Sequence, residues 1–311
     1  MTTSPRIVFM GSPRFAVPTL ELLAAQYPIT GVVTQPDRPA GRGRNVLPPP
    51  VKEAALLLGL PVIQPEKIRL PEAMSRLQDW APDLIIVAAF GQILRPAVLD
   101  LPRYGCLNVH GSLLPRWRGA APVQAAILAG DSQTGITIMK MDPGVDTGPL
   151  LSQRGIAISP TETGGTLFDR LAPLGAELLL ETLPRYLDGE LIPQPQPHEG
   201  VTYAPMLKKE DGLLDLSLPA LSLERRVRAF QPWPSTWFAW NGAPLKVLRA
   251  STTSQKSPGI GMRLTIGGSP AIGTGDGILI LEVVQPAGKK PMSGQAFLAG
   301  ARDWGASTNS E

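Results

Sequence analysis

The chain has 311 residues, of which 43% are hydrophobic and 18% charged, enough apolar material for two soluble domains with sizeable cores. It contains no apolar run long enough to span a bilayer, and its first strand-like segment follows the N-terminus so closely that we expect no signal or transit peptide. A net charge of +3 permits a polyanionic partner without requiring one.

Cysteine and histidine usage limits the chemistry open to the chain. The single cysteine, Cys106, excludes an internal disulfide and is typical of a reducing compartment, so we expect a cytoplasmic protein. The only two histidines are His110 and His198. Together with one cysteine they leave few ligands for zinc or another transition metal, so we expect no metal site.

Strand-like and helix-like segments alternate along the first two-thirds of the chain. The segments expected to be strands are 6–10, 29–34, 61–63, 83–90, 105–110, 136–141 and 150–158. The segments expected to be helices are 15–25, 51–58, 121–128 and 163–187, the last interrupted at Pro173 and Pro184. This alternation predicts an α/β domain with a parallel, Rossmann-like sheet. The turn GSPRFA after the first strand lacks the GxGxxG fingerprint, which argues against a nicotinamide cofactor.

The composition changes after residue 188. Pro193, Pro195 and Pro197 alternate with polar residues and indicate an extended linker. We therefore expect a catalytic domain over 1–188, a linker over 189–207 and a second domain over 208–311. In the second domain we expect a helix at 221–230, strands at 264–266 and 278–284, a hairpin at Asn241-Gly242, and a loosely ordered end from residue 300. Short strands separated by Gly and Pro turns predict a small barrel.

Two polar residues stand at the end of the apolar strand 105–110. Asn108 and His110 are two residues apart, so their side chains share one face, roughly 6.6 Å apart. Ligands bind beyond the carboxyl ends of strands in open α/β sheets, and Asp146 in a later loop could orient or charge the imidazole. Cys106 lies on the same face, but about 13 Å from His110 on a regular strand. We therefore interpret Cys106 as a core residue and not as a nucleophile.

The sequence around these residues carries a resemblance. The string CLNVHGSLLPRWRGAAP at 106–122, with DTGP at 146–149, resembles the active site of the enzymes that use 10-formyltetrahydrofolate. The longer string NVHGSLLPRWRGAAPVQ and the earlier TQPDRPAGRGR are similar to the branch of that family that formylates methionyl-tRNA. The resemblance covers nearly the whole chain and thins toward the C-terminus. It implies that a formyl group moves from 10-formyltetrahydrofolate, a co-substrate, to the α-amine of initiator methionyl-tRNA during translation initiation. It also implies that the small barrel is OB-like and binds tRNA; we expect a monomer.

The resemblance also implies site residues. Asn108, His110 and Asp146 would be catalytic. The folate pocket would be formed by Phe90, Gly91, Gln92, Ile93, Leu94, Ser112, Leu113, Leu114, Pro115, Asp142, Gly144 and Val145. Arginines in a glycine-rich loop are suited to gripping phosphates, so Arg38, Arg42 and Arg44 would bind the acceptor end of the tRNA, and Arg42 is the arginine that the resemblance matches. Lys208, Lys209, Lys289 and Lys290 are candidates for contacts along the tRNA backbone, and the interpretation as ordinary surface lysines has nearly equal support. The chain departs from the family pattern at Arg14, where an acidic residue is usual, and at Asn45, which makes the arginine loop less basic.

Two alternatives remain open from the sequence. Another 10-formyltetrahydrofolate-dependent formyltransferase, acting on a nucleotide, a sugar nucleotide or water, would share the three catalytic residues, so only the arginine loop and the basic second domain argue against it. A non-enzymatic RNA-binding protein would need the barrel alone, and the intact set of Asn108, His110 and Asp146 argues against that function.

Overall fold

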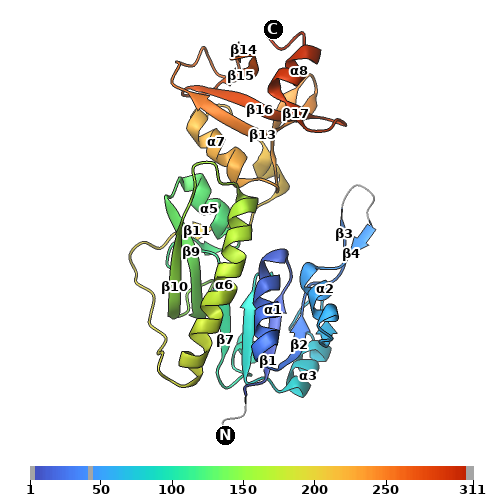
Figure 1. Ribbon diagram of the computed structural model, residues 1–311, viewed down its shortest axis with the longest axis vertical. Helices are drawn as coiled ribbons and strands as arrows, with labels where there is room; N and C mark the ends of the chain where they lie inside the picture. The colour runs from blue at the N-terminus through green and yellow to red at the C-terminus, as the bar shows by residue number, and fades with distance from the viewer. Residues whose placement is uncertain (1–3, 41–44, 306–311) are drawn as a thin grey trace. The chain divides into compact units, whose positions relative to one another are not determined.

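The computed structural model describes residues 4–40 and 45–305 and contains two compact units (Figure 1). The first unit comprises Met1–Pro122, Gln133–Ala157 and Phe168–Pro205. The second comprises Val123–Ser132, Ile158–Leu167 and Met206–Glu311. Each unit is thus assembled from stretches that are separate in the sequence.

The first unit is built on a seven-stranded sheet with the order β10-β9-β7-β6-β1-β2-β5. Its strands are β1 (Ile7–Gly11), β2 (Ile29–Val33), β5 (Val62–Ile63), β6 (Leu84–Ala88), β7 (Cys106–His110), β9 (Gln133–Lys140) and β10 (Leu150–Ala157). The five strands from β7 to β5 are parallel, as predicted, whereas β9 runs antiparallel to β7 and β10 antiparallel to β9. The sheet is therefore mixed. Burial alternates along β10, as is typical of an antiparallel strand with one solvated face.

Helices cover the sheet, and every residue of β1, β6 and β7 is buried. One face of the sheet packs against α3 and α4 in a cluster that includes Met10, Val87, Leu77, Trp80 and Leu99. The 3-10 turn η1 contacts α6 through the edge-on rings of Phe15 and Phe168, whose centroids are 5.8 Å apart. In Figure 1, α1 lies across β1. The helical segments are η1 (Arg14–Ala16), α1 (Val17–Gln26), α2 (Pro50–Leu57), α3 (Pro71–Trp80), α4 (Pro96–Leu99) and α6 (Gly164–Leu187).

The interruptions expected at Pro173 and Pro184 are wrong, because α6 is one continuous helix of 24 residues. A proline inside a helix costs about 3 kcal/mol. Leu171, Leu179 and Leu183 are completely buried along the same helix, and each buried leucine contributes roughly 2 kcal/mol. Packing therefore offsets the local cost of the prolines.

Two short pairs of strands complete the first unit. Strand β3 (Arg38–Ala40) pairs antiparallel with β4 (Asn45–Leu47). Strand β8 (Arg118–Gly119) pairs in parallel with β11 (Tyr203–Ala204). The second pair joins the segment after His110 to the end of the segment that the sequence indicates as a linker.

The second unit contains a six-stranded sheet with the order β12-β13-β16-β15-β14, to which β17 adds by pairing with β16. The predicted hairpin is confirmed: Asn241 and Gly242 join β12 and β13 with φ angles of 47° and 72°, the left-handed values that a two-residue hairpin turn needs. The other members of the unit include the helices α5, α7 and α8. The elements are α5 (Pro122–Ala129), η2 (Lys209–Gly212), α7 (Ala220–Ala229), β12 (Thr236–Trp240), β13 (Ala243–Thr253), β14 (Arg263–Ile266), β15 (Ser269–Gly273), β16 (Ile278–Pro286), β17 (Met292–Ser293) and α8 (Gly294–Gly300).

The loose order expected from residue 300 is wrong for the residues up to Gly305. Trp304 is only 2% exposed, and its ring packs against Phe238, Trp240 and Phe297. Its Nε1 donates to the carbonyl of Leu264 at 3.0 Å, which satisfies the one polar atom of the side chain. The end of the described chain is therefore part of the core. Among the described residues, no helix is long and apolar enough to cross a membrane.

Candidate active site

Asn108 and His110 lie at the carboxyl end of β7, and both side chains are buried, with exposed fractions of 9% and 5%. Their positions are fixed from both sides of the strand. Val87 of β6 lies opposite Asn108 in parallel register, and Thr137 of β9 lies opposite His110 in antiparallel register. Because Asn108 and His110 stand two residues apart on a regular strand, the two side chains share a face, as the sequence predicts.

Asp146 reaches this pair from the loop between β9 and β10. Its Oδ1 accepts a hydrogen bond from Asn108 Nδ2 at 3.4 Å, and its Oδ2 lies 3.6 Å from His110 Nδ1, an ion-pair distance when the imidazole is protonated. Asp146 Oδ2 also accepts from the backbone N–H of Gly119 at 2.8 Å. Gly119 has a φ of 121°, and a Cβ there would come within 2.4 Å of the Ala204 carbonyl oxygen, so glycine is required. The structure thus brings the three expected catalytic residues together.

The second ring nitrogen of His110 fixes the orientation of the imidazole. His110 Nε2 lies 3.0 Å from the carbonyl oxygen of Trp117. A carbonyl can only accept, so Nε2 carries a hydrogen and Nδ1 is the nitrogen that faces Asp146. The turn that supplies this carbonyl is itself tied to β9, because Thr137 Oγ1 donates to Ser112 O at 2.6 Å and accepts from Leu114 N at 3.1 Å.

The first segment of the expected folate pocket, residues 90–94, follows β6. Phe90 and Leu94 are buried in the sheet core, whereas Ile93 is 75% exposed. Gln92 holds neighbouring backbone, because its Oε1 accepts from Ile68 N at 2.7 Å and its Nε2 donates to Pro65 O at 3.1 Å. Gly91 has a φ of 81°, which suits a tight turn at the strand end.

The other expected folate residues lie in two segments beside β7. Ser112, Leu113, Leu114 and Pro115 follow His110 directly, with Ser112 and Leu114 buried. Asp142, Gly144 and Val145 precede Asp146 in its loop. Asp142 Oδ1 accepts from Gly144 N at 3.0 Å and from Thr147 Oγ1 at 2.7 Å, which shapes the loop, and Val145 is 55% exposed.

The expected tRNA contacts are divided between the units. Arg38 lies on β3, where its Nη2 pairs with Glu66 Oε2 at 2.8 Å. Arg42 and Arg44 lie outside the described residues. Lys208 and Lys209, at the start of η2, and Lys289 and Lys290, after β16, are all exposed on the second unit. Arg14, the departure from the family pattern, is exposed in η1, and nothing in the structure explains it.

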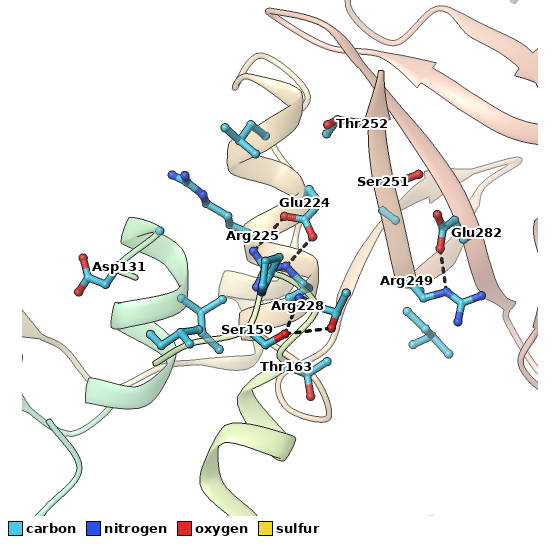
Figure 2. Close-up of a pocket in the computed structure, with 18 of the residues that line it drawn as sticks. Asp131, Ser159, Thr163, Glu224, Arg225, Arg228, Arg249, Ser251, Thr252 and Glu282 are labelled. Atoms are coloured by element: carbon cyan, nitrogen blue, oxygen red, sulfur yellow. Dashed lines mark hydrogen bonds and ion pairs between the residues drawn. The ribbon is translucent and has the colours of Figure 1, made fainter. Parts of the chain in front are cut away.

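A pocket of about 710 Å³ lies in the second unit, among α5, α7, β13 and the segment 158–163 (Figure 2). Two of its guanidinium groups face carboxylates: Arg228 pairs with Glu224, and Arg249 pairs with Glu282 at 2.8 Å. Arg225 Nη1 donates to the carbonyl of Ala129 at 3.4 Å. None of the three expected catalytic residues lines this pocket.

The interpretation of Cys106 as a core residue is confirmed. The side chain is 1% exposed within the cluster that covers one face of the sheet. Burial raises the pKa of its thiol to about 12, so the thiolate required of a nucleophile is not formed near neutral pH.

Sequence reasoning missed the residues that surround Asp146. Two of them, Gln196 and Thr202, come from the segment expected to be a linker. Gln196 bonds to Arg118 and to the backbone of Asp146, and Thr202 bonds to the backbone of Trp117. A glutamine in a proline-rich stretch gives no local sign of burial. The nearest signal was the string RWRGAAP itself, whose arginine and glycine at 118 and 119 are part of the resemblance.

A buried amide, an imidazole and a carboxylate beside the strand ends of an α/β sheet are suited to stabilising and protonating a tetrahedral intermediate, as in enzymes of acyl-type group transfer. The chain belongs to the formyl transferase family. The family model of the formyl transferase domain matches residues 6–183, and that of the formyl transferase C-terminal domain matches residues 206–302.

Known proteins resemble the chain over nearly its full length. The methionyl-tRNA formyltransferase of Chloroflexus aggregans is 52% identical, over 95% of this chain and 97% of that protein. The methionyl-tRNA formyltransferase of Myxococcus xanthus is 50% identical, over 95% of each. Among solved structures, WlaRD, a sugar 3N-formyl transferase crystallised in the presence of dTDP and 5-N-formyl-THF, has a TM-score of 0.66 at 16% identity, covering 93% of this chain and 100% of that chain. At that identity the likeness shows the fold alone.

Proposed function

We propose that the protein transfers a formyl group from 10-formyltetrahydrofolate to the α-amine of initiator methionyl-tRNA, for translation initiation. The observation that carries this function is the identity of 52% and 50%, over 95% of the chain, with methionyl-tRNA formyltransferases. The convergence of Asn108, His110 and Asp146 gives the activity a chemical basis.

In this reaction the amine nitrogen forms a bond to the formyl carbon, and the bond from that carbon to the folate nitrogen breaks. An α-amine has a reference pKa of about 7.7–8.0, so an appreciable fraction is neutral near pH 7 and no strong base is needed. The demanding steps are stabilising the oxyanion of the tetrahedral intermediate and moving a proton from the attacking nitrogen to the leaving one.

The three residues divide these tasks. Asn108 Nδ2 carries two hydrogens, of which one points at Asp146, so the other can donate to the oxyanion. His110 is held through Nε2 by the Trp117 carbonyl, so Nδ1 is the nitrogen that exchanges protons. Asp146, 3.6 Å from Nδ1, balances the positive charge of the imidazolium form and receives or relays the proton from the amine.

The binding surfaces follow the same proposal. Residues 90–94, the turn 112–115 and the loop 142–145 form the folate pocket, where backbone groups bind the pterin. Arg38, Arg42 and Arg44 grip the acceptor end of the tRNA, and the four lysines of the second unit contact its backbone. We further propose a catalytic domain over 1–188, a linker over 189–207, an OB-like tRNA-binding domain over 208–311, a monomeric state and a cytoplasmic location.

A second candidate is formylation of an amino sugar nucleotide. It is favoured by the fold neighbours that are sugar N-formyltransferases, at 16–18% identity. The relatives that are 52% and 50% identical to this chain weigh against it. They are methionyl-tRNA formyltransferases, and each aligns with 95% of the chain.

The decisive experiment compares formyl transfer to charged initiator tRNA with transfer to a dTDP-amino sugar, using the same donor and the same protein preparation. We expect transfer to methionyl-tRNA alone, with the product identified as formylmethionine after deacylation. Transfer to the amino sugar alone would establish the second candidate, and transfer to neither would overturn both.

A further inference from the structure

Gln196 lies in the segment between the two matched family domains, and its side chain is fully hydrogen-bonded inside the first unit. The residue is 9% exposed. Its Nε2 donates to the carbonyls of Asp146 and Gly148, both at 2.8 Å. Its Oε1 accepts from Arg118 Nε at 3.0 Å and from Arg118 Nη2 at 2.7 Å. These bonds fix the amide orientation, because carbonyls cannot donate and a guanidinium cannot accept.

One of the two carbonyls that Gln196 holds belongs to Asp146, whose backbone conformation determines where its carboxylate points. Asp146 has a φ of 51°, in the left-handed region that residues other than glycine seldom adopt. That backbone conformation directs the Asp146 carboxylate toward Asn108 and His110. Gln196 holds the backbone carbonyls at positions 146 and 148, on both sides of Thr147, so the loop cannot rotate at Asp146 without breaking these two hydrogen bonds, of which the one to Gly148 is buried.

The segment that contains Gln196 also holds the stretch 117–119, whose Gly119 N–H binds the Asp146 carboxylate. Thr202 Oγ1 accepts from Trp117 N at 2.9 Å, and Thr202 O accepts from Arg118 N at 2.9 Å. These bonds hold the stretch 117–119, in which the Trp117 carbonyl orients His110 and the Gly119 N–H binds Asp146. One segment therefore supports both the loop that carries Asp146 and the stretch that receives it.

We propose that Gln196 is a positioning residue for formyl transfer: through its carboxamide it holds Asp146 in the conformation that faces Asn108 and His110. The inference rests on the catalytic role proposed above for Asp146. Displacing a reacting group by about 1 Å can slow an enzyme by about 100-fold. We therefore expect that loss of the carboxamide lowers kcat and leaves substrate binding nearly unchanged.

Two variants of Gln196 test the role. Gln196→Met keeps the length of the side chain and removes all four hydrogen bonds. Gln196→Glu keeps the acceptor for Arg118 but turns a second oxygen toward the carbonyls of Asp146 and Gly148. We expect both to lower kcat with initiator methionyl-tRNA by about 10- to 100-fold, with KM for each substrate within about threefold of wild type. The matched control is Gln194→Met, from the same segment: its exposed side chain donates to the Ile192 carbonyl at 3.1 Å, and its loss should leave kcat unchanged.

A double-mutant cycle separates positioning from a structural role. If Gln196 acts through Asp146, Gln196→Met should change kcat less than twofold in a protein that already carries Asp146→Ala. Multiplicative losses, or wild-type kcat in a Gln196→Glu protein with an unchanged Tm, would overturn the positioning role. Wild-type kcat in Asp146→Ala alone would instead refute the proposed catalytic set, so the two failures are distinguishable. If Gln196→Met fails to fold, the Glu variant and its own cycle with Asp146→Ala decide.

Discussion

The polar side chains of the first unit converge on the expected catalytic set, whereas those of the second unit form ion pairs beside a pocket. In the first unit, Asp146 bonds to Asn108, 38 residues away, and Gln196 bonds to Arg118, 78 residues away. In the pocket of the second unit, Arg228 pairs with Glu224 one helical turn earlier, and Arg249 pairs with Glu282 on the neighbouring strand. Both sets join residues that are far apart in the sequence, since Arg225 in the pocket also bonds to Ala129, 96 residues away. The difference is that the network of the first unit holds the expected catalytic residues, whereas none of those residues lines the pocket.

The two units should therefore respond differently to substitution. In the first unit, the buried polar side chains hold the expected catalytic set in place, so one substitution among them should disturb the chemistry more than the stability. The second unit is held by apolar packing, above all by the aromatic rings around Trp304, so a substitution there should disturb stability more than the chemistry.

The largest effect is expected at the catalytic set. His110→Ala should lower kcat by roughly 10²–10⁴-fold, because general acid–base catalysis is lost, while folate affinity changes little. Steady-state kinetics with charged initiator tRNA measures the loss, and a thermal melt shows whether the fold is intact. His198→Ala, at the other and exposed histidine, is the control. Wild-type turnover in the folded His110→Ala protein would contradict the view that the polar network of the first unit carries the chemistry.

A loss of stability, and not of catalysis, is expected from a substitution in the aromatic core of the second unit. Trp304→Ala should cost about 3–5 kcal/mol of unfolding free energy in that unit, because it empties a buried site. Hydrogen exchange of the β13 and β16 amides reports this unit alone. We expect the exposed Trp233→Ala to cost far less. Equal protection in the two variants would contradict the view that packing dominates the second unit.

A smaller effect is expected at the arginine loop. Arg42→Ala should raise KM for tRNA by about tenfold at low salt and reduce the slope of log KM against log salt by about one, because one phosphate contact is lost. Arg69→Ala, which removes an exposed arginine of the first unit outside this loop, is the matched control. If both variants keep the wild-type salt dependence, the loop takes no part in binding tRNA.

The smallest effect is expected at Asp83, just before β6, where the central strands β6 and β1 of the first-unit sheet begin. The backbone N–H of Arg6, together with the Arg6 and Arg103 side chains, lowers the pKa of Asp83. Its folded pKa is below the unfolded value, so the stabilisation is present above about pH 4 and is lost as the pH falls through the folded pKa. Asp83→Asn should therefore cost about 1 kcal/mol at pH 7 and progressively less below pH 4, without changing kcat. Urea titrations at pH 7 and pH 3 measure both values, and a cost independent of pH would show that the carboxylate charge is not responsible.

Local patterns in the sequence were sufficient for the seven strands of the first-unit sheet, the hairpin and the shared face of Asn108 and His110, but not for short strands such as β8 and β11. Asn241-Gly242 specifies its turn because both residues tolerate positive φ, and Asn108 and His110 share a face because a strand repeats every two residues. Helix α3 could also have been found, since Pro71 at its start and the buried Ala73, Leu77 and Trp80 follow a helical period.

Only the tertiary structure decided the rest, because the deciding contacts join residues far apart in the chain. The antiparallel direction of β9, the continuity of α6 through Pro173 and Pro184, and the burial of Trp304 all depend on packing that no short window of sequence contains. The same holds for Gln196: its residue type permits four hydrogen bonds, but only the folded chain places Asp146, Gly148 and Arg118 around it.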